Sequence, residues 1–200
     1  MTVQAILALI LALSIFVASP GPGVFAVIAR ALSHGFLASL SFIVGVIIGD
    51  LTYLSLAILG LSAIATAFGQ LFILVKILGG FYLIYLALKS IRTAKDNSEA
   101  AQGKKQGFLG GLLLTLANPK VILFYLGFLP SFVDLNNLTL NSAAILVLIV
   151  ALVILFVLGS YAFFAARLRG FFQNEQARAQ LKRVSGVFLL AIGIIVIIKK

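Results

Sequence analysis

The chain has 200 residues, of which 62% are hydrophobic and only 10% are charged, and its mean hydropathy is +1.22. A soluble domain carries about 25% charged residues, so this composition excludes an ordinary soluble protein and indicates an integral membrane protein. The net charge of +10 does not indicate a nucleic-acid-binding protein, because the basic residues lie between apolar runs. No cysteine and a single histidine are present, so we predict neither a metal site nor a cofactor.

Six apolar runs approach or exceed the roughly 20 residues that a membrane-spanning helix needs. They cover residues 4–29, 36–66, 70–88, 108–130, 142–166 and 184–198. The sequence therefore predicts an all-α membrane protein with six transmembrane helices. We interpret the first run as a retained helix and not as a signal peptide, because no positive charge precedes Arg30.

The first run is interrupted near its middle by Ser19-Pro20-Gly21-Pro22-Gly23. A helix break inside the hydrocarbon core persists only where protein or a wet cavity receives the freed backbone groups. Ser19 is a good N-cap, and proline is favoured at the first position after a cap. We therefore expect a new half-helix to begin here, with free N–H groups that favour an anion and glycines that let a ligand approach closely.

The second run contains Asp50, the one acidic residue that lies deep in an apolar run. A charge at that depth costs roughly 2.5–3.5 kcal/mol, so we interpret Asp50 as a proton carrier or as the partner of a cationic group. The alternative is a buried ion pair with Lys120 or Lys76 that only holds helices together. Tyr53, three residues further on, shares the face of Asp50 and is placed to hydrogen-bond to it.

The fourth run is interrupted by Asn118-Pro119-Lys120, which repeats the cap-and-proline pattern of the first run. Two interpretations of Lys120 remain open: it balances the charge of Asp50, or it adds positive charge to an anion site. At 1.5 Å per residue, Pro20 and Pro119 lie about 14 Å and about 17 Å from the inner ends of their runs. Both breaks are therefore predicted near the midplane of a core about 30 Å thick.

Lysine and arginine are unevenly distributed among the loops. The loop after the first run carries Arg30, and the loop after the third carries Lys89, Arg92, Lys95, Lys104 and Lys105. The loop after the fifth run carries Arg167, Arg169, Arg178, Lys182 and Arg183. The loops after the second and fourth runs carry no lysine or arginine. The positive-inside rule then places the odd-numbered loops in the cytoplasm.

The six runs divide into two groups of three. Because each group has an odd number of spans, the second must enter the membrane in the opposite orientation, and matched breaks in two halves are typical of transporters with inverted repeats. We predict a first repeat at 1–88, a cytoplasmic linker at 89–107 and a second repeat at 108–200. Within the first repeat, Gly45 and Gly49 form a G-x-x-x-G pattern that predicts close helix packing.

Several motifs together resemble the LysE/RhtB family of bacterial amino-acid exporters, from the N-terminus to at least residue 133. The motifs are Ser19-Pro20-Gly21-Pro22, Arg30, Gly35, Gly45, Gly49-Asp50, Gly79-Gly80-Phe81-Tyr82-Leu83, Ala117-Asn118-Pro119-Lys120 and Phe128-Leu129-Pro130. Gly23 departs from the family pattern, which usually has a polar residue there, often Asn. The resemblance implies efflux of amino acids across the inner membrane of a bacterium, driven by the proton motive force.

The residues and the resemblance together predict a secondary active exporter and not an enzyme. The half-helix N-termini at 19–23 and 118–120 would bind the substrate carboxylate, and Asp50 with Tyr53 would bind its ammonium group or the coupled proton. With one deep acid, neutral substrates such as homoserine, threonine or leucine are favoured over lysine or arginine. The alternatives are a cation or metal exporter of a related superfamily and a non-transporting scaffold. A bundle this thin also makes a homodimer plausible.

Overall fold

The computed structural model describes residues 2–59, 102–135 and 137–168, together with isolated positions within 77–88 and 187–194. The described part is helical and contains no strand. Its elements are α1 (Val3–Ala18), α2 (Pro22–His34), α3 (Phe36–Ile58), α5 (Gln102–Leu116), α6 (Pro119–Leu123), the π-helix η1 (Phe124–Phe128), the 3₁₀-helix η2 (Leu129–Ser131) and α7 (Leu140–Leu168). The predicted third and sixth helices, at 70–88 and 184–198, lie largely outside the described residues.

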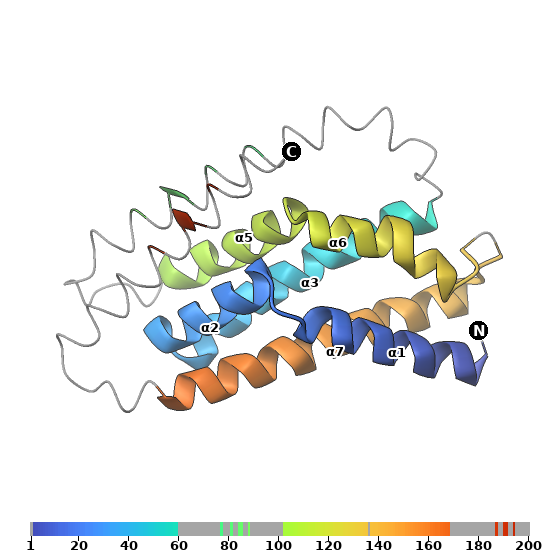
Figure 1. Ribbon diagram of the computed structural model, residues 1–200, viewed down its shortest axis with the longest axis horizontal. Coiled ribbons are helices and arrows are strands. Elements are labelled where there is room, and N and C mark those ends of the chain that lie inside the picture. Colours follow the sequence, from blue (N-terminus) through green and yellow to red (C-terminus); the bar gives the residue numbers. More distant parts are fainter. Residues whose placement is uncertain are drawn as a thin grey trace.

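Two broken helices run in opposite directions through the bundle (Figure 1). The first consists of α1 and α2, which are bent by 62° across the break. The second consists of α5 and α6, which continue through η1 and η2. α7 lies along both halves of the first broken helix, and α3 crosses α5, so both breaks face the middle of the bundle. α5 begins at Gln102, inside the segment predicted as a linker.

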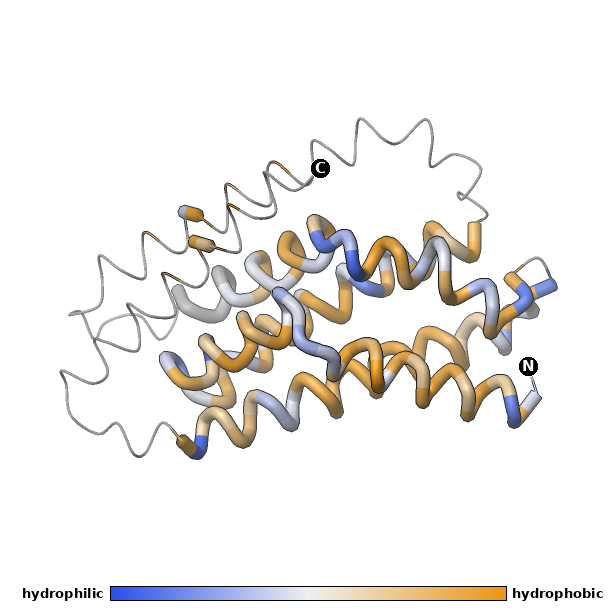
Figure 2. The backbone as a smooth tube through the Cα atoms, in the orientation of Figure 1, coloured by the Kyte–Doolittle hydropathy of each residue, from blue (hydrophilic) through white to orange (hydrophobic). Residues whose placement is uncertain are grey.

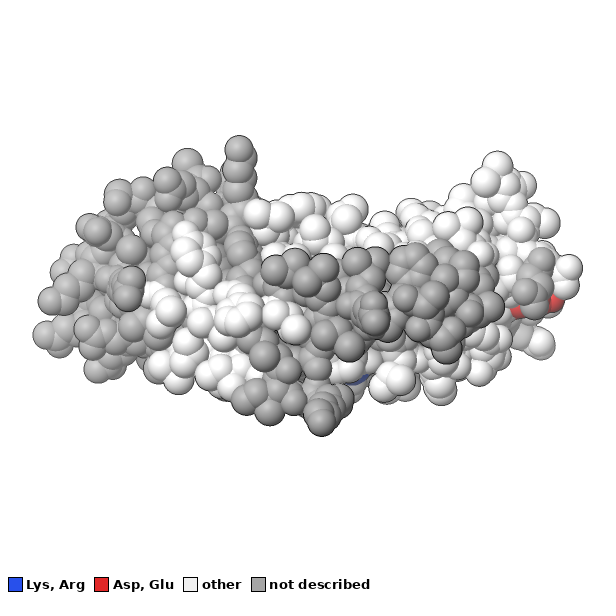
Figure 3. All heavy atoms as spheres, turned by 90° about the horizontal axis from the view of Figure 1, so that it is seen from above, with Lys and Arg blue, Asp and Glu red and all other residues white. Residues whose placement is uncertain are grey.

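Two of the described helices are long and apolar enough to cross a membrane, and a bent pair adds a third candidate. α3 and α7 each qualify as a span by length and composition, and the bent pair α1–α2 gives a third if it is counted as one span. Large apolar side chains cover the outer faces of these helices; Phe156 is 77% exposed and Leu11 is 63% exposed. Hydrophilic positions gather at the break between α5 and α6 and at the ends of the bundle (Figure 2). Among the described residues visible from above, charged atoms are few (Figure 3).

Hydroxyl side chains on the helices hydrogen-bond to carbonyl oxygens of their own helix. Ser39, Thr52 and Ser55 on α3 donate to the carbonyls four residues earlier, as does Ser160 on α7, at 2.7–2.9 Å. This back-bonding satisfies a polar group without a partner helix. These hydroxyls therefore sit in apolar helices without requiring water.

α3 and α5 cross with almost no side chain between them. A Cβ added to Gly45 would lie 2.0 Å from the Phe108 carbonyl oxygen, and one added to Gly111 would lie 2.0 Å from the Phe42 carbonyl oxygen. The packing predicted from the G-x-x-x-G pattern is confirmed, since a Cβ on Gly49 would also lie 2.7 Å from Cβ of Thr115. This crossing fixes α3, and with it Asp50, against the second broken helix.

Candidate functional site

A small cavity lies at the level of the two breaks, between α1, α3, α5 and α7. Its volume is about 50 Å³. Charged or polar side chains in its wall come from Asp50, Thr115, Asn118 and Lys120; apolar ones come from Phe16, Val17, Val24, Val46, Leu114, Val121, Ile154 and Leu158, and the wall also includes Gly21 and Gly23. At roughly 10–15 Å³ per water, the cavity holds a few water molecules.

The first break extends from Ser19 to Gly21, and here the predicted N-cap is wrong. Ser19 is the C-cap of α1, and its hydroxyl donates to the Phe16 carbonyl at 2.7 Å. Gly21 is the N-cap of α2, Pro22 begins that helix, and no side chain caps it. The cap moves because a residue before proline is held in extended conformation, and the last proline of Pro20-Gly21-Pro22 sets the start of α2.

The second break follows the sequence prediction. Asn118 is the N-cap of α6, and its side-chain oxygen accepts a hydrogen bond of 3.1 Å from the backbone N–H of Lys120. Pro119 occupies the first helical position. α6 has only five residues before the π-helix begins, so a ligand here would be attracted by the charge of Lys120 more than by a long helix dipole.

Lys120 connects the two breaks. Its ammonium group donates to the carbonyl oxygen of Phe16 at 2.7 Å, to that of Ser19 at 2.9 Å and to the Ser19 hydroxyl at 2.7 Å. A lysine has three donors, so all are used at the end of α1. Within the described residues, the proposed ion pair between Lys120 and Asp50 is therefore not formed; Lys76 lies outside them.

Two tyrosines satisfy carbonyl groups that the breaks leave free. Tyr161 on α7 donates to the Ala18 carbonyl at 3.0 Å, at the first break. Tyr53 on α3 donates to the Leu116 carbonyl, at the second break. The hydrogen bond that the sequence suggested between Tyr53 and Asp50 is therefore wrong, because a freed backbone acceptor takes the Tyr53 hydroxyl.

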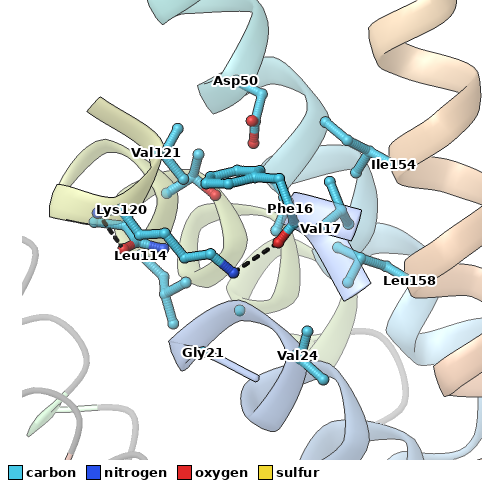
Figure 4. Close-up of a pocket in the computed structure, with 14 residues that line it drawn as sticks. Phe16, Val17, Gly21, Val24, Asp50, Leu114, Lys120, Val121, Ile154 and Leu158 are labelled. Carbon is cyan, nitrogen blue, oxygen red and sulfur yellow. Dashed lines mark hydrogen bonds between the residues drawn. The ribbon is translucent and has the colours of Figure 1, made fainter. Parts of the chain in front are cut away.

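Asp50 projects from α3 towards the cavity and is only 3% exposed (Figure 4). The hydroxyl of Tyr125 is fully buried and interacts with the Asp50 carboxyl group, although the geometry falls short of a regular hydrogen bond. Tyr125 belongs to the π-helix η1, a feature that often marks functional sites. No sequence signal identified Tyr125, because no pattern in residues 124–128 predicts a π-helix.

The structure brings together five of the ten residues that the sequence singled out. The cavity wall includes Gly21, Gly23, Asp50, Asn118 and Lys120, whereas Ser19, Pro20, Pro22, Tyr53 and Pro119 are not part of it. Ser19 and Tyr53 act on the ends of the broken helices instead. Sequence reasoning missed Phe16 and the aliphatic wall from α7, which consists of Ile154 and Leu158. Within the described residues, no group of three or more His, Cys, Asp or Glu could hold a metal ion.

Comparison with known proteins gives a consistent result. A family profile described as LysE type translocator matches residues 14–200. An uncharacterized membrane protein of Synechocystis is 34% identical over 197 residues, covering 96% of this chain and 95% of that protein. An uncharacterized membrane protein of Pseudomonas aeruginosa is 35% identical, covering 87% of this chain and 85% of that protein. A leucine efflux protein of Klebsiella pneumoniae is 34% identical, covering 60% of this chain and 59% of that protein. No solved structure matches the chain significantly.

Proposed function

The chain belongs to the family of LysE-type translocators, and from that membership we propose that it exports neutral amino acids across the bacterial inner membrane in exchange for protons. Membership makes it a membrane transporter rather than an enzyme. The observation that carries the proposal is one cavity in which the described wall residues supply a single carboxyl group, that of Asp50, and a single ammonium group, that of Lys120. An amino acid is a zwitterion, so these two groups complement its two charges.

The apolar part of the cavity supports a neutral, aliphatic substrate. Val24, Leu114, Ile154 and Leu158 present only hydrocarbon. Among the described residues of the cavity wall, Asp50 is the one acid, so a second cationic group on the substrate would find no further acidic partner there. The similarity to a protein named for leucine efflux favours the same class of substrate.

The carboxylate subsite is proposed at the first break. The N-terminus of α2, at Gly21 and Pro22, opens towards Lys120, and a Cβ on Gly21 would lie 3.5 Å from the Lys120 ammonium nitrogen. α2 has 13 residues, enough for its N-terminal N–H groups to attract an anion. Asp50, at the other side of the cavity, would bind the substrate ammonium group in one state and a proton in the other.

We also propose that the two broken helices belong to inverted repeats, at 1–88 and 108–200, which move about the cavity. Two observations support this arrangement. α1–α2 and α5–α6 run in opposite directions (Figure 1), and the tyrosine that caps each break comes from the other repeat. Tyr53 of the first repeat caps the second break, and Tyr161 of the second repeat caps the first.

The proposal is tested with purified protein in liposomes. We expect counterflow of leucine to exceed counterflow of lysine, and Asp50→Asn to abolish substrate flux driven by a pH gradient. Asp134→Asn is the matched control, because Asp134 is the exposed acid of the described part and lies outside the cavity wall. Normal pH-driven flux in Asp50→Asn would remove this carboxyl group from the coupling mechanism. Metal-ion flux without amino-acid counterflow would overturn the substrate assignment.

A further inference from the structure

The Phe16 side chain forms part of the cavity wall, near both charged groups. Its ring is drawn between the Asp50 carboxyl group and the Lys120 ammonium group in Figure 4, and all three residues contribute to the cavity wall. The Lys120 nitrogen lies 4.6 Å from the centre of the Phe16 ring. The Phe16 ring also stacks on the Phe124 ring, with 4.3 Å between the ring centres and 28° between the ring planes. An aromatic side chain of α1, before the first break, is thus packed against one that follows the second break.

The space left around this ring is too small for an amino acid. A volume of about 50 Å³ holds a few water molecules, whereas an amino acid that reaches both charged groups needs the space taken by the ring. The described conformation is therefore closed between the Lys120 side and the Asp50 side. A substrate can contact both groups only after the Phe16 ring has moved.

The backbone of Phe16 is held by the same lysine. The Phe16 carbonyl oxygen accepts a hydrogen bond of 2.7 Å from Lys120, and Ser19 supplies the other two acceptors. A substrate carboxylate that binds Lys120 must replace at least one of these neutral acceptors. The present bonds already have an ionised donor, but a carboxylate adds a full negative charge that a carbonyl oxygen lacks, and its attraction to the ammonium group is strong in a site of low dielectric constant. This attraction favours the exchange, which frees the end of α1.

We propose that Phe16 is a gate between the two charged subsites and that Lys120 keeps it closed until a carboxylate binds. The arriving carboxylate takes Lys120 away from α1, the end of α1 moves, and the ring no longer separates the substrate from Asp50. The identity of the carboxylate compound rests on the proposed function. The barrier itself does not, because it follows from the place of the Phe16 ring between the two charged groups.

The test is chemical labelling of Asp50 with a water-soluble carbodiimide and a small amine, quantified by mass spectrometry of peptides. Labelling of the exposed Asp134 in the same sample serves as the internal reference. We expect Phe16→Ala to raise the labelling ratio of Asp50 to Asp134 severalfold. Phe156→Ala, which removes a ring that is 77% exposed on α7, should leave the ratio at the wild-type value.

Equal Asp50 labelling in wild type and Phe16→Ala would overturn the gate. If Phe16→Ala does not fold, as judged by its thermal unfolding, Phe16→Leu decides the question, because it keeps an apolar side chain but removes the planar ring. A ratio above wild type then supports the gate, and a wild-type ratio overturns it. Absent counterflow with increased labelling would refute the proposed function alone. Normal leucine counterflow with unchanged labelling would refute the gate alone.

Discussion

At the first break the oxygens at the end of α1 accept hydrogen bonds from Lys120 of the second break, whereas at the second break Asn118 caps its own helix. The first break also has a glycine N-cap with no side-chain hydrogen bond and a bend of 62°. The helix start at the second break is therefore capped by its own residue, whereas the oxygens at the first break depend on a cation that a substrate can attract. The comparison indicates that the first break is the part that moves and the second is its support.

The largest effect on stability is expected from Lys120→Met, which tests whether the first break depends on this lysine. The substitution leaves the Ser19 carbonyl without a donor and the Phe16 carbonyl with the Ser19 hydroxyl alone, and an unsatisfied buried acceptor costs about 1–3 kcal/mol. We expect the free energy of unfolding to fall by at least about 2 kcal/mol in equilibrium unfolding experiments. Lys120→Arg keeps a cationic donor and should retain most of that stability. Wild-type stability in Lys120→Met would show that the first break does not depend on the lysine.

The next largest effect on stability is expected from removing the tyrosine hydroxyl that caps each break. Tyr53→Phe and Tyr161→Phe each remove one hydroxyl from one freed carbonyl. We expect each to lower the free energy of unfolding by about 1–2 kcal/mol. Because the hydroxyls cap different breaks, the double variant should equal the sum within about 0.5 kcal/mol. A coupling well above that value would mean that the breaks do not behave as separate units.

A smaller effect distinguishes the two candidate caps. Asn118→Ala removes a side-chain cap and should cost about 1 kcal/mol of unfolding free energy. Ser19→Ala removes one acceptor of Lys120 but leaves both carbonyl acceptors in place, so we expect a loss of about 0.5 kcal/mol. Equilibrium unfolding of both variants gives the order directly. The reverse order would mean that the Ser19 hydroxyl contributes more to stability than the Asn118 cap does.

The smallest expected effect on stability is that of Gly21→Ala. This variant tests the role of the first break through its effect on transport. The added methyl group would lie 3.5 Å from Cδ and Nζ of Lys120, an ordinary contact, and the backbone is extended there. We expect stability within about 0.5 kcal/mol of wild type but a higher half-saturation concentration in counterflow. Gly23→Ala is the matched control, since its methyl group would meet only Leu114 at 3.9 Å. Equal half-saturation values in both variants would exclude an approach past Gly21.

The sequence anticipated the breaks because proline acts locally. Pro119 with Asn118 before it gave the correct helix start, and Pro20 gave the correct place for the first break. The exact cap at the first break was missed because two prolines compete, and the second, Pro22, begins the helix. Local chemistry thus predicted where the helices end, with an error of two residues at the doubled proline.

The partners of the polar groups were harder to predict because tertiary packing selects them. Tyr53 shares a helix face with Asp50, but the Leu116 carbonyl of another helix takes its hydroxyl. Tyr125 approaches Asp50 through a π-helix that the sequence does not announce. Asp50 itself was identified correctly as a deep acid, because an acidic residue in a long apolar run is visible without any partner.

The crossing of α3 and α5 has a consequence for how this sequence can evolve. At Gly45 and Gly111 an added Cβ would meet a backbone carbonyl oxygen, which every residue type carries. No second substitution on the facing helix can remove that oxygen, so a damaging change at either glycine has no suppressor at its contact position. Gly49 differs, because its nearest neighbour is the Thr115 side chain. At this contact the small residue can lie on either helix, so we expect Thr115→Gly to rescue Gly49→Ala.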